Sequence, residues 1–395
     1  MAAEDVVITG IGLVSCLGEG ADTHWSALAS GALSPVVDTA TFPPYSFHPL
    51  PEIDWNTQIP KRSDQRQMEL WQRLGTYTAG LALDDAGIKA DKDLLSRTDM
   101  IIAAGGGERD EAVDEAILAA SETRDDRDML LNEKLTTDLR PTLFLAQLSN
   151  LLAGNISIVH NVTGSSRTFM GEEGAGVAAL ATALSRIASG QSKITLVGGA
   201  FQSAYRSMIL GHALGRHLHA GPWKPLWQRG DSEGGGMVPG SGGAFLVLES
   251  RSHAEDRGAR IYARLAKVLA ERTHAGNPDR AGTLGRLLDA ALPGSDETLV
   301  ISGASGARQA LEAERAVFAA RPGLRPRGMA TGVGHLQEAQ FPFAVALAAL
   351  ALDKSQAYPP FEAAEPASTA APAAALATMV GHVSGEGVAL VEREA

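Results

Sequence analysis

The sequence predicts an α/β protein in which helices cover both faces of a largely parallel sheet. Short apolar runs of strand type recur along the 395 residues, and stretches with helical spacing of apolar residues separate many of them. The composition agrees, because 45% of the residues are hydrophobic and 43 are glycine, which suits buried helices and close backbone contacts. A chain of this length forms either two ordinary domains or one large two-lobed one.

The expected elements follow in chain order. Residues 5–9 form an apolar, β-branched strand that ends in a turn at Gly10 to Gly12, and residues 66–86 form a helix that Gly87 stops. Further strand-like runs occupy residues 99–107, 156–160, 193–200, 242–249, 297–305 and 387–392. The Pro- and Ala-rich residues 358–378 are expected to be an ordered loop leading to the last strand.

Charge and cysteine content exclude several classes of protein. The formal charge of −12 argues against a general binder of nucleic acid or of anionic membranes. The start of the chain has no basic segment followed by an apolar run, and no apolar run reaches about 18 residues, so neither a signal peptide nor a membrane span is expected. Cys16 is the single cysteine, which excludes an intrachain disulfide and a cysteine-based zinc cage. We therefore expect a soluble, cytoplasmic protein.

One stretch, TGSSRTFMGEEGAGVAALATAL at residues 163–184, predicts a glycine- and serine-rich loop that runs into a buried helix. Val177, Leu180 and Leu184 follow helical spacing, and alanines fill much of the opposite side. Unpaired amides at such a helix start stabilise a thiolate or an oxyanion. Glu172 and Glu173 stand there, and the residues alone favour ordinary first-turn acids that complement the helix dipole.

Seven stretches together resemble one enzyme family. They are VVITGIGLVSCLGEG, HWSALASG, RLGTYTAGLALDDAGI, LSNLLAGNISIVHNVTGSSRTF, ASGQSKITLVGGA, GGGMVPGSGGAFLVLESRSHAEDRGARIYARL and ATGVGHLQEAQFPFAVALAAL. In this order, and nearly at this spacing, they resemble landmarks of the β-ketoacyl-acyl-carrier-protein synthases, and the resemblance runs from residue 5 to 392. Within the family, the chain is most similar to alphaproteobacterial paralogues associated with the very long acyl chain of lipid A.

The resemblance implies a thiolase-like fold and a condensing site. Two similar α/β halves, residues 1–250 and 251–395, are expected to pack into a layered α-β-α-β-α body that usually dimerises. Active members carry a cysteine at the start of the buried helix, which takes an acyl group from a carrier protein. Two histidines from the second half assist decarboxylation of malonyl carrier protein and stabilise the enolate.

Several of these family positions are altered here. The cysteine position falls on Glu173, and the first histidine position falls on Ser302. The second histidine is kept as His335, but Ala330 stands where the family has a lysine. The late GFGG turn, whose phenylalanine gates the pocket, corresponds to residues 382–385, HVSG. The resemblance therefore keeps the scaffold and loses most of the chemistry.

The leading hypothesis is a catalytically degenerate partner of an active synthase, similar to a chain-length factor. A carboxylate that attacks a thioester gives an acid anhydride, which is a poor intermediate in water. Cys16 lies in the turn after the first strand with nothing nearby to activate it, and a structural role is expected. The implied partners are acyl carrier protein and a cysteine-bearing paralogue, in a heterodimer, or a second copy in a homodimer.

Two alternatives stay open at this stage. The chain could be a malonyl-carrier-protein decarboxylase or a residual condensing enzyme, with a protonated Glu173 imitating an amide and His335 donating to the enolate oxygen. It could also bind a dinucleotide, because Gly10 and Gly12 follow a strand, although Ser15 fills the third glycine position and no ribose-binding acid follows. No cofactor is expected.

Two further clusters of residues are candidates for binding. His212, His217 and His219 lack an acidic or cysteine partner at matching spacing, so a polar lid is predicted and no metal site. The basic stretch at residues 61–67 is expected to be a solvated helix entry. In the family a similar stretch meets the acidic carrier protein, and the resemblance assigns Arg62 and Arg66 to that contact.

Overall fold

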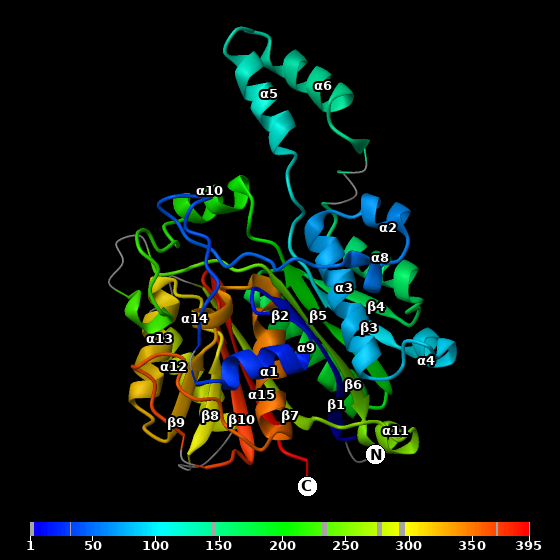
Figure 1. Ribbon diagram of the computed structural model, residues 1–395, viewed down its shortest axis with the longest axis vertical. Coiled ribbons are helices and arrows are strands. Elements are labelled where there is room, and N and C mark those ends of the chain that lie inside the picture. Colours follow the sequence, from blue (N-terminus) through cyan, green and yellow to red (C-terminus); the bar gives the residue numbers. More distant parts are fainter. Residues whose placement is uncertain are drawn as a thin grey trace.

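A computed structural model of the chain describes residues 4–31, 33–141, 143, 147–230, 235–274, 279–291, 297–368 and 370–394. Its centre is one mixed sheet of eleven strands in the order β4-β3-β5-β6-β1-β7-β11-β10-β8-β9, with β2 paired to β1 (Figure 1). The strands are β1 (Val6–Ser15), β2 (Gly18–Glu19), β3 (Asp99–Ala103), β4 (Ser166–Phe169), β5 (Ile194–Phe201), β6 (Gly242–Ser250), β7 (Ala263–His274), β8 (Thr298–Ser302), β9 (Leu324–Gly328), β10 (Ala374–Val380) and β11 (Ser384–Glu392).

The sheet repeats one pattern of strand directions in its two parts. In the first part β4, β3 and β5 are parallel to one another. The sheet then continues by antiparallel pairing, from β5 to β6 and from β6 to β1. In the second part β9, β8 and β10 are parallel to one another. Antiparallel pairing then leads from β10 to β11 and from β11 to β7. β1 and β7 connect the two parts through the pair Val7 and Arg264. The division of the chain at residue 250 stays a prediction.

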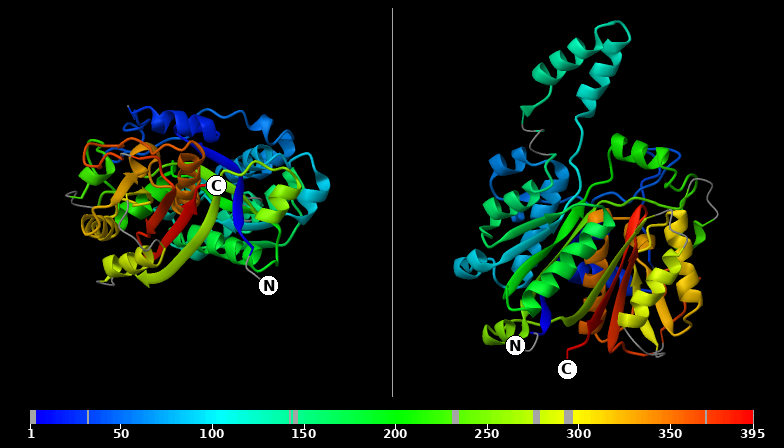
Figure 2. Two further views of the ribbon diagram at one scale, coloured as in Figure 1. Left: turned by 90° about the horizontal axis from the view of Figure 1, so that it is seen from below. Right: turned by 180° about the vertical axis from the view of Figure 1, so that it is seen from behind.

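The helices form three layers around the two parts of the sheet. They are α1 (Ala21–Ala29), α2 (Arg62–Gln67), α3 (Leu70–Asp85), α4 (Lys92–Arg97), α5 (Glu111–Ser121), α6 (Arg127–Thr137), α8 (Leu151–His160), α9 (Glu173–Ala188), α10 (Arg206–Leu214), α11 (Arg251–Asp256), α12 (Arg280–Ala291), α13 (Arg308–Ala319), α14 (Ala330–Val333) and α15 (Gln340–Asp353), with 3₁₀ turns η1 (Trp55–Thr57), η2 (Leu226–Gln228) and η3 (Gln337–Ala339). α3 packs on the first part of the sheet and α12 on the second, while α9 and α15 contact both (Figure 2). This α-β-α-β-α layering confirms the prediction of a thiolase-like fold.

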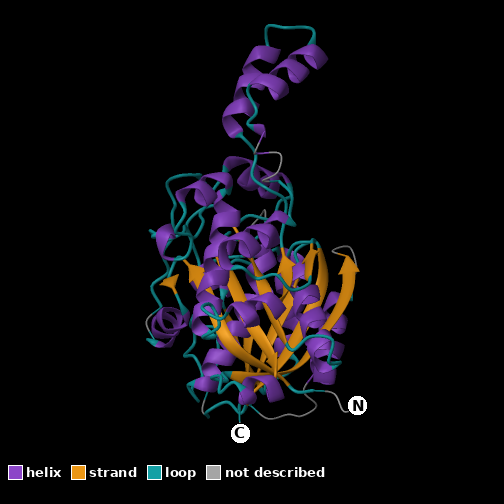
Figure 3. Cartoon of the chain, turned by 90° about the vertical axis from the view of Figure 1, so that its right-hand side faces the viewer, coloured by secondary structure: helices purple, strands orange, loops and turns teal. Residues whose placement is uncertain are grey.

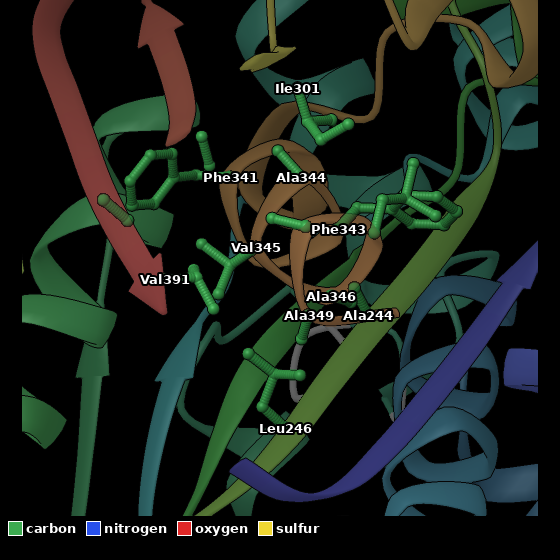
Figure 4. Packing of buried hydrophobic residues seen from close by; sticks show 14 of the residues in the cluster. Ala244, Leu246, Ile301, Phe341, Phe343, Ala344, Val345, Ala346, Ala349 and Val391 are labelled. Carbon is green, nitrogen blue, oxygen red and sulfur yellow. The ribbon is translucent and has the colours of Figure 1, made fainter. Parts of the chain in front are cut away.

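The central layer forms the largest part of the core. Every residue of α15 from Gln340 to Leu352 is buried, because this helix lies between the two parts of the sheet. Figure 4 shows α15 from close by, with Phe343, Ala346 and Ala349 near Ala244 and Leu246 of β6. The amphipathic pattern is absent from this helix since neither face meets water.

The prediction of a largely parallel sheet is wrong. Four central strands, β1, β6, β7 and β11, pair with their neighbours in antiparallel direction. Strands buried on both faces read as continuous apolar runs whichever direction they take, so the pattern that indicated parallel pairing does not decide it. The expected strand at residues 156–160 is also wrong. It is the last part of α8, which Asn161 ends in the left-handed conformation (φ 59°).

The turn expected at Gly10 to Gly12 is wrong, because β1 continues through both glycines to Ser15. Their role is close packing against α3: a Cβ atom on Gly12 would lie 2.2 Å from the carbonyl oxygen of Thr78. These glycines therefore bring a helix onto a strand and form no phosphate loop. The helix expected at 66–86 is also divided, because Met68 and Glu69 leave helical geometry between α2 and α3.

Helices α5 and α6 form a hairpin that projects from the body of the molecule (Figures 1 and 3). Its apolar side chains are in part turned to solvent, with 67% of Leu118 and 70% of Met129 exposed. No described helix is both long enough and apolar enough to cross a lipid bilayer.

Candidate functional site

The site is built around the first residue of α9, Glu173, whose side chain is fully buried. The preceding residue, Glu172, has a positive φ of 55°, so the chain turns sharply as it enters the helix after Gly171 (φ 125°). This turn places two adjacent carboxylates differently: Glu173 faces the protein interior, while the side chain of Glu172 keeps 38% of its surface exposed. Glu173 is thus the first-turn acid of α9 that the residues alone predict, whereas Glu172 precedes the helix at its N-cap position.

Two histidines from the second part of the fold converge on Glu173. Its Oε1 accepts hydrogen bonds from the backbone N–H of His382 at 3.0 Å and from Nδ1 of the same residue at 2.9 Å. His335 Nε2 also lies 2.9 Å from Oε1, although off the line of a hydrogen bond. The other carboxylate oxygen, Oε2, faces Gly381 and has no hydrogen-bond partner among the described residues. Glu173 is thus held firmly by one oxygen.

Local backbone contacts position both histidines. The N–H and carbonyl of His335 pair with Val238 and Gly240, both at 2.9 Å. His382 lies in the tight turn between β10 and β11, which the backbone hydrogen bond from Gly381 to Gly385 closes at 2.8 Å. Both side chains therefore reach Glu173 from rigid elements.

The charges at this centre follow from the same contacts. Burial raises the pKa of the Glu173 carboxyl, but His382 and His335 outweigh it and hold the pKa well below its usual range. Burial lowers the pKa of His382, yet the neighbouring Glu173 carboxylate reverses this and raises it to about 9. At neutral pH the centre therefore contains a buried ion pair between an ionised Glu173 and a cationic His382.

A third carboxyl group stands close by. Glu338 of η3 is buried, and burial together with the charges of Glu173 and Glu172 raises its pKa to about 7. Glu338 follows His335 by three residues, so η3 brings this carboxyl to the same centre.

Ser302 and Cys16 do not join this centre. Ser302, at the end of β8, donates a short hydrogen bond to Glu314 of α13, and no described hydrogen bond links it to Glu173 or His335. Cys16 is buried, donates to the carbonyl of Gly332 at 3.3 Å, and lies 3.6 Å from His48 Nδ1. Burial raises the pKa of the Cys16 thiol to about 12, so it is protonated and unreactive at neutral pH.

The structure brings His382 to two of the three histidines that the sequence analysis grouped. His212 of α10 and His217 of the following loop lie edge to face with His382, with ring centroids 5.5 and 4.9 Å away. His219 is elsewhere, with its Nε2 2.8 Å from the carbonyl of Pro222. We name His212, His217 and His382 the histidine cluster. It lines an open cavity of about 460 Å³ together with Glu172 and Glu338.

The predicted docking residues lie on the surface. Arg62 and Arg66 are exposed on α2, next to Lys61, and neither forms an ion pair within the described ranges of the chain. A second cavity, of about 380 Å³, lies beside the first turns of α9, where Phe169, Val177 and Ala178 contribute apolar surface.

The fold is shared with solved ketosynthases. The structure titled "The ishigamide ketosynthase/chain length factor" superposes with a TM-score of 0.80 over 100% of both chains, at 21% sequence identity. The molecule therefore has the thiolase-like fold of ketosynthases.

Sequence comparison gives the family. Residues 3–254 match the N-terminal domain of beta-ketoacyl synthases, and this chain belongs to the beta-ketoacyl synthase family. It is similar to 3-oxoacyl-[acyl-carrier-protein] synthase 2 of Vibrio harveyi, with 26% identity over 299 residues, which are 73% of this chain and 68% of the relative. The protein of the same name from Rhizobium meliloti is 30% identical over 277 residues, which are 65% of this chain and 62% of the relative.

Proposed function

We propose that this chain is a non-condensing subunit that pairs with a cysteine-bearing β-ketoacyl-acyl-carrier-protein synthase and helps to set the length of its acyl product. The observation that carries the proposal is the state of Glu173, the residue at the nucleophile position. It is buried, ionised and bound by its Oε1 to two N–H groups of His382.

A carboxylate in this state is a poor nucleophile. Its attack on an acyl thioester would form an anhydride and would leave the cation of His382 without its buried counter-ion. Ser302 cannot replace the missing histidine, because a hydroxyl bound to Glu314 neither accepts a proton at neutral pH nor points to the centre. Acyl transfer within this chain therefore lacks both its nucleophile and one of its donors.

Other features support a partner subunit. The exposed Leu118 and Met129 on the projecting hairpin are apolar surface of the kind that protein partners cover. The cavity beside α9 has the volume of a small-ligand pocket and partly apolar walls, which suits an acyl chain. Exposed Arg62 and Arg66 suit an acidic carrier protein. A cytoplasmic location is part of this proposal.

The test is reconstitution. The purified chain, a cysteine-bearing synthase from the same genome and their mixture are each supplied with acyl and malonyl carrier proteins. We expect the chain alone to turn over at least ~10³-fold more slowly than the ~10 s⁻¹ typical of enzymes, and the mixture to form a heterodimer with altered product length. Condensation by the chain alone at ordinary rates would exclude the proposal, and so would a mixture that neither associates nor changes its products.

Malonyl decarboxylation is the second function, and the charge of Glu173 opposes it. An enolate that develops beside an ionised carboxylate is repelled, whereas an amide at that place would donate a hydrogen bond. Glu173→Gln is the matched variant, because it keeps the size and removes the charge. Release of carbon dioxide from malonyl carrier protein should be absent in the wild-type chain; release that is abolished by His335→Ala but kept in Cys16→Ser would favour the decarboxylase instead.

A narrower part of the proposal concerns the product. Assignment to the very long acyl chain of lipid A has its support in the sequence resemblance. Mass spectrometry of lipid A from a strain without this gene tests it: loss or shortening of the longest acyl chain is expected, and an unchanged lipid A would remove the assignment.

A further inference from the structure

The histidine cluster brings three imidazoles together from separate parts of the sequence. His212 comes from the last turn of α10, His217 from the loop after it, and His382 from the turn between β10 and β11. Each offers one nitrogen, and the three nitrogens lie within 4.8 Å of one another. Imidazole nitrogens at such separations are the donor set that zinc and related metals prefer in proteins.

A carboxylate completes the set. Glu172 Oε1 lies 3.7 Å from His382 Nε2, and Glu172 lines the same cavity as the cluster. Its positive φ turns it away from the buried Glu173 and leaves its side chain 38% exposed, so the carboxylate is accessible to an ion from solvent. Three histidines and one carboxylate make four ligands, as tetrahedral zinc requires.

Glu173 supplies the support that metal-binding histidines usually have. It accepts a hydrogen bond from Nδ1 of His382, which fixes the ring so that Nε2 is the nitrogen left to face Glu172. When the ion binds at Nε2, the proton that this nitrogen carries in the metal-free protein is released to solvent. A carboxylate behind a histidine is a common outer contact of metal sites, because it sets the tautomer and makes the ligand more basic. Glu173, the residue in the nucleophile position, thereby gains a positioning role.

We propose that the histidine cluster, completed by Glu172, binds a divalent transition-metal ion of the Zn²⁺ type. The ion would join α10, the loop after it and the β10–β11 turn above the nucleophile position. This inference goes beyond the proposed function and is independent of it, since it concerns the binding of an ion and not acyl chemistry.

The movement required of the three imidazoles is small, while Glu172 Oε1, which lies 3.7 Å from His382 Nε2, must turn from its partly exposed position toward the ion. Ligand atoms ~2.0–2.1 Å from a tetrahedral metal are about 3.3 Å apart, so nitrogens within 4.8 Å close on an ion by modest side-chain rotations. One present contact competes: His212 Nε2 lies 2.9 Å from the amide Nε2 of Gln337. If that nitrogen is the ligand, the amide must turn away, and Gln337 lines the open cavity where it has room to do so.

A second grouping, Glu173 with His335 and His382, also has its ligand atoms within 4.8 Å. It is the less suitable site for two reasons. Glu173 Oε1 already accepts two hydrogen bonds from His382. Neither Glu173 nor His335 lines the cavity that opens to solvent, whereas all three members of the histidine cluster do.

The test measures metal binding directly. The full-length protein is stripped with a chelator and titrated with Zn²⁺ by calorimetry and with Co²⁺ by visible absorption, whose intensity reports tetrahedral coordination. We expect one ion per chain and an intense tetrahedral Co²⁺ spectrum. His217→Ala removes a ligand from a loop and should weaken Zn²⁺ binding more than 100-fold, while Glu173→Gln, which acts through His382, should weaken it about 10–100-fold.

His219→Ala is the matched control, because this histidine lies two residues from His217 and outside the cluster. It should bind Zn²⁺ as the wild type does. The proposal is overturned if the stripped wild type binds less than half an equivalent, if the Co²⁺ spectrum is weak and octahedral, or if His217→Ala and His219→Ala lose affinity equally. Circular dichroism of each variant separates lost ligation from lost folding, and Glu172→Gln, at a partly exposed position, repeats the test where folding is least affected.

Discussion

Removal of His382 should expose the cost of the buried Glu173 charge. The substitution His382→Ala deletes the Nδ1 hydrogen bond at 2.9 Å and the cation, while the carboxylate stays fully buried with His335 as its remaining histidine neighbour. Breaking a buried pair by removing one partner costs about 3–5 kcal/mol of unfolding free energy, because the other charge is left uncompensated. We expect a loss in this range for the metal-free protein.

A double-mutant cycle isolates the charge from the lost packing. Glu173→Gln in the His382→Ala background removes the stranded charge, so the double variant should be about 1.5–3 kcal/mol more stable than His382→Ala alone. The pKa of Glu173 is lowered in the fold, so its contribution is present above about pH 4.5 and is lost as the pH falls. The pKa of His382 is raised, so its contribution is complete below pH 6.5 and is lost as the pH rises through about 9.

The assay is therefore urea denaturation at about pH 6, where both charges contribute to stability. Unfolding is followed by tryptophan fluorescence and circular dichroism, with a chelator present. Coincident curves from the two probes justify reading free energies from them. The reasoning fails if His382→Ala costs less than about 1 kcal/mol, or if adding Glu173→Gln brings no recovery.

Three further predictions concern other parts of the molecule. Burial raises the pKa of Glu314 from 4.5 to about 7, so this group favours the fold below pH 4.5 and loses that contribution, at most ~3 kcal/mol, as the pH rises through 7. Glu314→Gln should therefore be more stable than the wild type at pH 8 but not at pH 4.5, and equal urea midpoints at pH 8 would disprove this. Charge reversal at Arg62 and Arg66 together should weaken carrier-protein binding about tenfold in low salt, measured by calorimetry, and unchanged affinity would exclude this docking surface. Leu118→Glu with Met129→Glu should weaken association with a synthase partner by about 30-fold in analytical ultracentrifugation, and an undisturbed complex would place the interface elsewhere.

The overall fold was predictable because its main signals are local or belong to a whole family. The apolar stretch at residues 177–188 is part of α9, of which one face is buried, and the runs at 193–200 and 242–249 are β5 and β6, nearly at their expected bounds. Residues 156–160 were mistaken for a strand since a five-residue apolar run fits either a strand or the end of a helix. Strand directions failed for a different reason: burial on both faces hides whether neighbours run parallel.

The site was predictable only at its centre. The resemblance located Glu173 and His335, and these two side chains do meet. His382 was missed as a partner because it lies 209 residues from Glu173, in a turn that sequence analysis treated only as an altered gate. The histidines at 212 and 217 are predicted to lack an acidic partner, since His382 reaches them through the fold and brings Glu172 beside itself, which sequence spacing does not show. One signal in the sequence could have indicated His382 as a site residue. It is the histidine of the HVSG turn, where a purely structural role does not call for an imidazole.

The most direct test of the central claim is intact-protein mass spectrometry during turnover. The chain and a cysteine-bearing synthase are incubated together with acyl carrier protein and malonyl carrier protein, quenched, and weighed separately. We expect an acyl increment on the synthase cysteine and an unmodified mass for this chain. An acyl group bonded to this chain, mapped to Glu173 by peptide analysis and formed at the rate of turnover, would contradict it.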